Sequence, residues 1–310
     1  MFDHFVWSVL VVPLVVVALT ALLGERLPPA PAAVVLAWSA AGAALAGLVN
    51  LAAFTVKAAA EVPVVAGFFE WSTQPVIADT ARERWVPWLC AALLVSAAVA
   101  TARVAARHRR VRSLARGLIG SAGTDEVVLV ESRSVEAFAV PGRPGRIVVT
   151  TSMRQALTDA QFEALVAHER AHLERGHSRL MLLSDLAGAV HPAFRWVSKR
   201  VGYLVERAAD EHAALAVGDR KVLARAIGTA ALAARGRPAL EAGPFASFAR
   251  AKRPGAIPRR VTALLGRRIH GRRIWPVAIP AVFAVSSLIW TVEAVYDLVE
   301  LLVLAHGAYG

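Results

Sequence analysis

Long apolar runs divide the chain into membrane segments and a more polar central part. Four runs carry no charged residue and are long enough to cross a bilayer, which takes roughly 17–25 residues: Phe5–Leu23, Ala32–Val56, Trp85–Ala102 and Ile274–Val292. One or two buried core helices would be the alternative. The opening "MFDH" has no Lys or Arg, so the first run is not typical of a signal peptide. The pattern predicts a polytopic membrane protein with four transmembrane helices.

Charge gives these helices an orientation. Hydrophobic residues make up 56% of the chain and charged residues 19%, which is too apolar for a soluble globular protein. Of 35 Lys and Arg, 31 lie between Arg103 and Arg273 with 14 of the 23 acidic residues, so this block carries +17 and the rest −5. Positive charge beside membrane helices marks the cytoplasmic side. Because the Arg clusters flank the helices, direct nucleic-acid binding is not expected.

The orientation predicts a domain plan for a multi-pass protein of the cell membrane. Both termini are external and the basic block is cytoplasmic. We expect three transmembrane helices in residues 1–106 (about 5–23, 32–56 and 85–106) with an external loop at 57–84, a cytoplasmic domain at 107–273, and a fourth transmembrane helix with an external tail at 274–310.

Periodicity within the block predicts an α+β domain in an otherwise mainly α protein. β-Branched runs indicate strands at 125–132 and 146–152, with a short strand and a turn between them at 135–145. Residues 157–177 read as a helix with a Thr158–Gln161 capping box. Further helices are expected at about 180–190, 193–216 and 258–268, and a mobile loop rich in Gly, Pro and Arg at 235–258.

The segment "LVAHERAHLERGH" contains two histidines four residues apart, His168 and His172, with Glu169 after the first. Residues at this spacing lie on one helix face, so both imidazoles can reach a single metal ion. Glu169 can then act on a metal-activated water, which is the His-Glu-x-x-His arrangement of zinc proteases. An ordinary helix face with two histidines is the alternative.

A catalytic zinc needs a third protein ligand. Glu206 in "VERAADEHAAL" can supply it, and Asp210 on the same helix face can orient a ligating histidine. Glu211 and His212 are less convincing ligands, and a solvated helix face is the alternative for this whole segment. The other candidates are Tyr203 and Arg207 for stabilising an oxyanion, His177 as a helix-end residue, and His191 as a turn residue without a chemical role.

The segments "AFAVPGRPGRIVVTTSM", "ALTDAQFEALVAHERAHLERGH" and "VERAADEHAA" together resemble the integral-membrane gluzincin zinc metallopeptidases. These include the heat-shock membrane protease, the CAAX prenyl endopeptidases and the β-lactam sensor-transducer (antirepressor) peptidases. The resemblance implies Zn²⁺ ligands His168, His172 and Glu206, a Glu169 base and an orienting Asp210. It also implies that Ala137, Phe138 and Ala139 form an edge strand that binds substrate, although Glu136 stands where Asn is usual.

The helix layout resembles the sensor-transducer branch without its C-terminal sensor domain, whereas the strand sequence is closer to the heat-shock group. We therefore expect a membrane-embedded zinc endopeptidase that cleaves a cytosolic or membrane-associated protein, plausibly a winged-helix transcriptional repressor. A quality-control protease for membrane proteins is one alternative. A non-enzymatic receptor or scaffold without zinc is the other.

Overall fold

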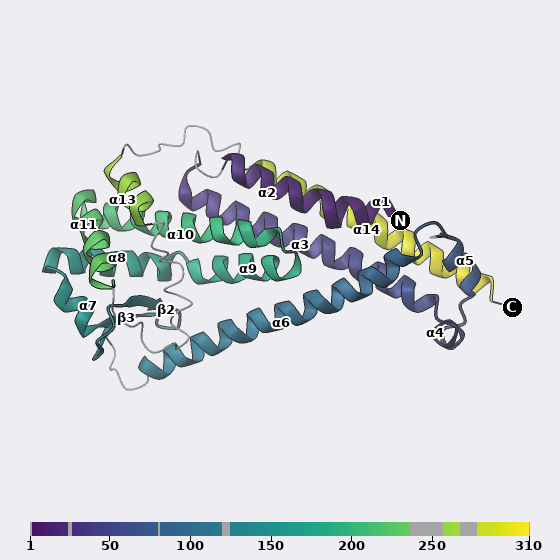
Figure 1. Cartoon of the computed structure of the whole chain (residues 1–310), viewed down its shortest axis with the longest axis horizontal. Helices are drawn as coiled ribbons and strands as arrows, with labels where there is room; N and C mark the ends of the chain where they lie inside the picture. The colour runs from purple at the N-terminus through teal and green to yellow at the C-terminus, as the bar shows by residue number, and fades with distance from the viewer. Residues whose placement is uncertain are drawn as a thin grey trace.

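The computed structural model describes residues 2–23, 27–79, 81–119, 125–235, 257–266 and 278–309. These residues form mostly helices and one small sheet. Long helices run lengthwise through an elongated molecule; the sheet lies toward one end and both termini at the other (Figure 1). In chain order the helical elements are α1 (Phe2–Phe5), the π-helix η1 (Val6–Val11), α2 (Val12–Leu23), α3 (Pro29–Ala60), α4 (Pro63–Phe68), α5 (Thr73–Asp79), α6 (Trp85–Ile119), α7 (Thr151–Ala156), α8 (Asp159–Glu174), α9 (His177–Val190), α10 (Phe194–Val217), α11 (Arg220–Ala233), α13 (Ile257–Leu265) and α14 (Ala278–Gly307).

Four helical segments are long and apolar enough to cross a membrane, as the sequence predicts: Asp3–Leu22, Pro29–Ala60, Trp85–Gly117 and Ala278–Gly307. Three of them are longer than expected. Helix α6 continues through the basic run that follows the third apolar stretch, and α14 continues through the acidic segment that was expected to be a tail. At 1.5 Å per residue, 32 residues span about 48 Å, so α3 extends beyond a hydrocarbon core of about 30 Å.

Helix α3 is the centre of the bundle. It packs against α14, α10, α6 and α9, and buries one alanine after another along its length. Small side chains let helix backbones approach closely, which is how helices associate in a bilayer. The largest buried cluster joins the first half of α3 to α2, α10 and α14 through residues such as Leu36, Phe194 and Leu204. Helices of the central block therefore share a core with the membrane helices.

Helices α9 and α10 form a hairpin that lies along α3 (Figure 1). The "HP" pair at 191–192 separates them, as predicted, because proline cannot continue a helix. Gly188 allows close packing at this hairpin: a Cβ there would lie only 3.3 Å from backbone atoms of Arg195. The hairpin brings α10, which carries Glu206, beside the membrane helices.

The sheet contains the three expected strands in shorter form: β1 (Val127–Val130), β2 (Ala137–Val140) and β3 (Arg146–Thr150). Their order is β1-β3-β2, with β1 parallel and β2 antiparallel to β3. β2 therefore lies at an edge of this sheet. Thr150 ends β3, bonds to the backbone of Glu136 and caps α7 through its hydroxyl, which fixes the sheet to the helices that follow.

The other predicted elements have mixed outcomes. The predicted helices at 157–177, 180–190, 193–216 and 258–268 correspond to α8, α9, α10 and α13. Most of the predicted loop, residues 236–256, lies outside the described residues. The expected external loop contains the short helices α4 and α5, and the buried Lys57 pairs with Asp79 to hold α5 against α3.

Candidate metal centre

Helix α8 positions the two histidines. Its N-terminus has the predicted capping box, with reciprocal bonds between Thr158 and Gln161. Its apolar face, which includes Leu165 and Val166, packs on the sheet cluster. Small residues on another face bring it close to α10 and α11: Ala164, Ala167, Ala213 and Ala214 share one buried cluster. This close packing leaves His168 and His172 facing α10.

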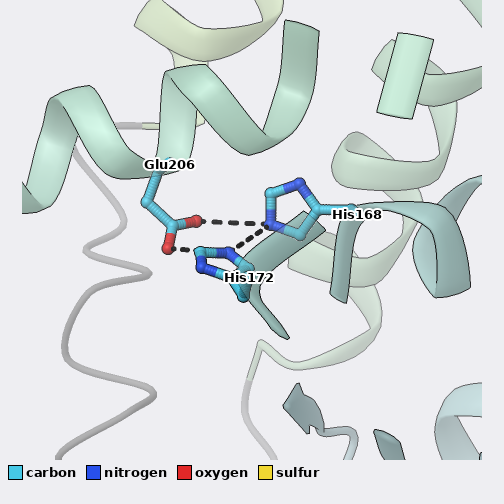
Figure 2. Close-up of side chains that lie close together, drawn as sticks. All are labelled: His168, His172 and Glu206. Atoms are coloured by element: carbon cyan, nitrogen blue, oxygen red, sulfur yellow. Dashed lines mark hydrogen bonds and ion pairs between the residues drawn. The ribbon is translucent and has the colours of Figure 1, made fainter. Parts of the chain in front are cut away.

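Three side chains from α8 and α10 converge on one point: His168, His172 and Glu206 (Figure 2). The Nε2 atoms of the two histidines are 3.2 Å apart. Each of them lies 3.6 Å from an oxygen of the Glu206 carboxylate. His168 and Glu206 are buried, and His172 is half-buried. The structure therefore brings together the three residues that the sequence predicted as metal ligands.

These separations fit a tetrahedral ion. Ligand atoms at 2.0–2.2 Å from zinc lie roughly 3.3–3.5 Å apart along the edges of a tetrahedron. The separation of 3.2 Å between the two Nε2 atoms is close to that range, and each Nε2 lies 3.6 Å from a different oxygen of the Glu206 carboxylate. Two imidazoles and one carboxylate are also a known ligand set of catalytic zinc, with the fourth position open. The residues present therefore fit zinc in their chemical type and in their closeness to one another.

A buried arginine completes the charge balance around the centre. Arg260 of α13 reaches Asp210 with two bonds of 2.7 and 2.6 Å, and its third nitrogen lies 2.8 Å from Glu206. Asp210 in turn lies 3.0 Å from Nδ1 of His168. Uncompensated buried charges are costly, so this arrangement lets two carboxylates stay ionised beside the histidines. Asp210 lies where the sequence predicted an orienting group.

The sequence patterns did not predict a role for Arg260 at this centre. It lies next to Arg259 in a short amphipathic helix, and only one of the two is buried. Arg220 holds this helix in place, because it donates to the carbonyls of Ala263 and Leu264 while pairing with Glu211. The helical apolar spacing of "RRVTALL" predicts which side packs, but Asp210 and Glu206, which Arg260 contacts, lie 50 and 54 residues before it in the chain.

The charges around the centre lower the pKa values of its two carboxylates and raise the pKa of His168. Burial alone would raise the pKa of Glu206, but Arg260 and the histidines hold it well below its usual range. Burial would also raise the pKa of Asp210, but Arg260 outweighs burial and lowers that pKa. Burial opposes a charge on His168 as well, yet its contacts with Asp210 and Glu206 raise its pKa to about 9 in the absence of a metal. The two carboxylates are therefore ionised at neutral pH.

His177 is more than a helix-end residue. It begins α9, is buried, and its Nδ1 lies 3.1 Å from Nδ1 of His172. Burial, together with the neighbouring His172, lowers the pKa of His177 to about 3, so its ring is neutral at ordinary pH. A neutral ring can accept a hydrogen bond from His172 Nδ1, which leaves Nε2 of His172 facing Glu206.

A cavity of about 1600 Å³ opens beside the centre. Glu169, His172 and Glu206 line it, and so do Ala137, Phe138 and Ala139 of the edge strand β2. Tyr203 also lines the cavity. The cavity wall includes Val34 and Trp38 of α3 and Ala100 and Val104 of α6, which belong to two membrane-spanning segments.

The remaining candidates lie apart from the metal cluster. Glu211 pairs with Arg220, and His212 pairs with Glu174, so neither of these alternative ligands joins the three-residue cluster. Arg207 lies 3.9 Å from Glu211 and does not line the cavity. His191 contacts the ring of Phe194 and the backbone of Ala193 at the turn between α9 and α10, in keeping with a structural role.

Comparison with known proteins agrees with this geometry. Residues 101–194 match the model of Peptidase family M48. The matched stretch includes His168, Glu169 and His172 but ends before Glu206, whose place beside them comes from the structure. The chain is also similar to "Protease HtpX" from Alkalilimnicola ehrlichii, at 29% identity over 87 residues.

That similarity covers 27% of this chain and 28% of the relative, so the aligned stretch spans less than a third of either protein. No solved structure matches the chain. The two matches are similarities to metallopeptidases over part of the chain, and the His/His/Glu cluster and the four apolar helices agree with a metal site in a multi-pass membrane protein.

Proposed function

We propose that this protein is a zinc-dependent endopeptidase of the membrane, with His168, His172 and Glu206 as zinc ligands and Glu169 as general base. The observation that carries the proposal is the convergence of two imidazoles and one carboxylate, whose ligand atoms lie within 4.8 Å of one another. This ligand set of a catalytic zinc leaves a fourth position for water or substrate. Substrate has access to this position, because the cluster borders the large cavity.

Each side chain has a defined task in the proposed reaction. Zinc in this site would supply a Lewis acid for the scissile carbonyl and would make water acidic enough to attack at neutral pH. Glu169 takes the proton of the attacking water and delivers it to the leaving amine. Asp210 and His177 each contact one ligating histidine and hold the ring that faces Glu206. Arg260 keeps the carboxylates ionised.

Ala137, Phe138 and Ala139 have a proposed role in binding the substrate main chain. β2 lies at the edge of the sheet and faces the cavity that holds Glu169. An extended peptide can add to such an edge through main-chain bonds, which tolerate many side-chain sequences.

The orientation is proposed from charge and shape together. The +17 block that contains the centre would be cytoplasmic. Both termini would be external, and they lie together at the end of the molecule away from the sheet (Figure 1). Membrane helices form part of the cavity wall, so substrates associated with the bilayer have a direct approach to the site.

Two classes of substrate are proposed as alternatives. The similarity to Protease HtpX favours a heat-shock-type membrane protease that acts on membrane proteins. Cleavage of a cytosolic repressor is the second alternative, favoured by the predicted layout of three helices before the cytoplasmic block and one after it. Protein fragments that accumulate in cells with the active enzyme, and not with a Glu169→Gln form, would identify the substrate class.

Metal content and proteolysis together test the function. We expect the purified full-length protein to hold one zinc ion per chain and to cleave an unfolded protein substrate. A chelator should abolish cleavage and added zinc should restore it. A receptor or scaffold would purify without stoichiometric zinc and would cleave nothing, which would contradict the proposal.

A further inference from the structure

The cavity beside the metal centre has an excess of positive charge along its lining. Six basic side chains line it away from the metal ligands: Arg103, Arg107 and Arg112 of α6, Arg179 of α9, and Arg195 and Lys199 of α10. Within the described part of the chain, none of the six forms an ion pair. The cations come from three helices around one cavity, whereas an ordinary solvated face would carry them on the outer side of one helix.

The acidic residues of the same cavity are already engaged. Glu126 holds Arg170 with two bonds of 2.7 and 2.9 Å. Asp185 accepts from Ser198 and lies 3.1 Å from His108. Glu174 pairs with His212, outside the group of six. The cavity therefore offers cations to a ligand and has few free carboxylates to repel an acidic one.

Helix α10 connects these cations to the reaction centre. Arg195, Lys199 and Glu206 lie within about 40° of each other around the helix, at 100° per residue, and all three line the cavity. Lys199 is then about 10 Å from Glu206 along the helix axis, and Arg195 about 16 Å. An extended peptide advances roughly 3.3 Å per residue, so these distances correspond to about three and five peptide residues.

We propose that this cationic wall selects peptide substrates with acidic side chains about three to five residues from the cleaved bond, on one side of it. Arg195 and Lys199 are the specificity-determining residues, and the α6 arginines face the same space. The inference rests on the proposed peptidase function. A peptide is favoured over a lipid headgroup as the ligand because Arg195 and Lys199 share a cavity-facing stripe with Glu206.

Peptides that differ by one charge test the proposal. The zinc-loaded full-length protein would be assayed with quenched fluorescent peptides that share a core and carry Asp, Asn or Lys three to five residues from the cleaved bond, on either side. We expect kcat/KM to fall from Asp to Asn to Lys in steps of about three- to ten-fold, on one side only, the size of partly exposed charge contacts. Mass spectrometry would locate the cleaved bond.

Charge reversal on α10 should invert this order. The double variant Arg195→Glu/Lys199→Glu should prefer Lys, and Arg195→Gln/Lys199→Gln should show no order. Arg109→Glu/Arg110→Glu is the matched control, because it reverses two charges on α6 that do not line the cavity. It should keep the original order.

Each contrary result has its own meaning. If the parent cleaves all peptides equally, or the Arg195→Glu/Lys199→Glu variant keeps the parent's order, the specificity proposal is wrong and the peptidase function stands. Cleavage of no peptide at all would contradict the peptidase function and this inference with it. The same assay in vesicles with and without anionic lipid tests whether the cations bind lipid headgroups instead of peptide. Rates that follow the lipid charge and not the peptide charge would mean that the cations bind headgroups.

Discussion

Two regions of this molecule contain buried polar groups of different kinds. Around the metal centre the buried groups are ionic: Arg260 contacts Glu206 and Asp210, and these two carboxylates lie 3.0 to 3.6 Å from the histidines. In the middle of the membrane bundle Asn50, Ser287 and Thr291 are buried and neutral, whereas the buried Lys57 lies near the end of α3 and pairs with Asp79. Asn50 donates to Thr291, which donates to Ser287 in its own helix.

The difference shows where charge can be stabilised. A charge in the bundle would meet lipid and alanine, whereas hydroxyl and amide groups satisfy themselves on nearby carbonyls. At the centre, α8, α10 and α13 bring positive and negative side chains together, and the candidate ligands among them can bind a cation. Buried charge in this region therefore marks the proposed chemistry, and buried neutral polarity in the bundle marks helix packing.

The largest effect is expected in the charged region, from removal of the general base alone. Glu169→Gln should lower kcat by roughly 10²–10⁴-fold, because an amide cannot take the proton of the attacking water. Its zinc content should stay at one per chain. Glu163→Gln, an exposed position on the same helix, is the control and should cleave normally. Full activity in Glu169→Gln would rule out the proposed mechanism.

Removal of the buried cation should destabilise the fold next most strongly. Arg260→Met leaves Glu206 and Asp210 without their cation, and loss of one partner from a buried pair costs about 3–5 kcal/mol of unfolding free energy. The loss should be smaller with zinc bound, since the ion compensates Glu206. Thermal or denaturant unfolding with and without zinc would measure it. The exposed neighbour gives the control, Arg259→Met, and equal effects of the two substitutions would contradict the assignment.

Loss of the orienting carboxylate should act on the metal more than on the fold. Asp210→Asn keeps the shape but removes the negative charge beside His168 Nδ1, so zinc affinity should fall by about 10–100-fold. Competition with a chromogenic chelator would measure the affinity. Glu174→Gln, a carboxylate at the end of α8 that pairs with His212, should leave zinc binding unchanged. An unchanged affinity in Asp210→Asn would show that Asp210 does not orient the ligand.

The smallest effect is expected in the bundle. Thr291→Val removes the acceptor of the Asn50 bond without changing the shape, and interhelical hydrogen bonds in membrane proteins contribute about 0.6 kcal/mol on average. Unfolding in mixed micelles would measure this. Thr101→Val removes a hydroxyl that bonds only to its own helix and should change stability less. A cost for Thr291→Val as large as that of Arg260→Met would contradict the contrast between the two regions.

The sequence alone determined the features that depend on local pattern. Apolar runs predicted the four membrane segments, and a Thr158–Gln161 capping box predicted the start of α8. The spacing of His168 and His172 placed both rings on one face because helix geometry has a fixed period. Chemical type then pointed to Glu206 and Asp210, although spacing could not rank them against Glu211 and His212.

Only the tertiary structure decided the features that join distant segments. The packing of α8 on α10 brought Glu206, and not His212, to the histidines. The docking of α13 showed which arginine of a pair is buried, and the α9–α10 hairpin brought His177 to His172 and turned Arg195 and Lys199 into the cavity. These outcomes depend on packing and mutual charge between elements, which no local period encodes.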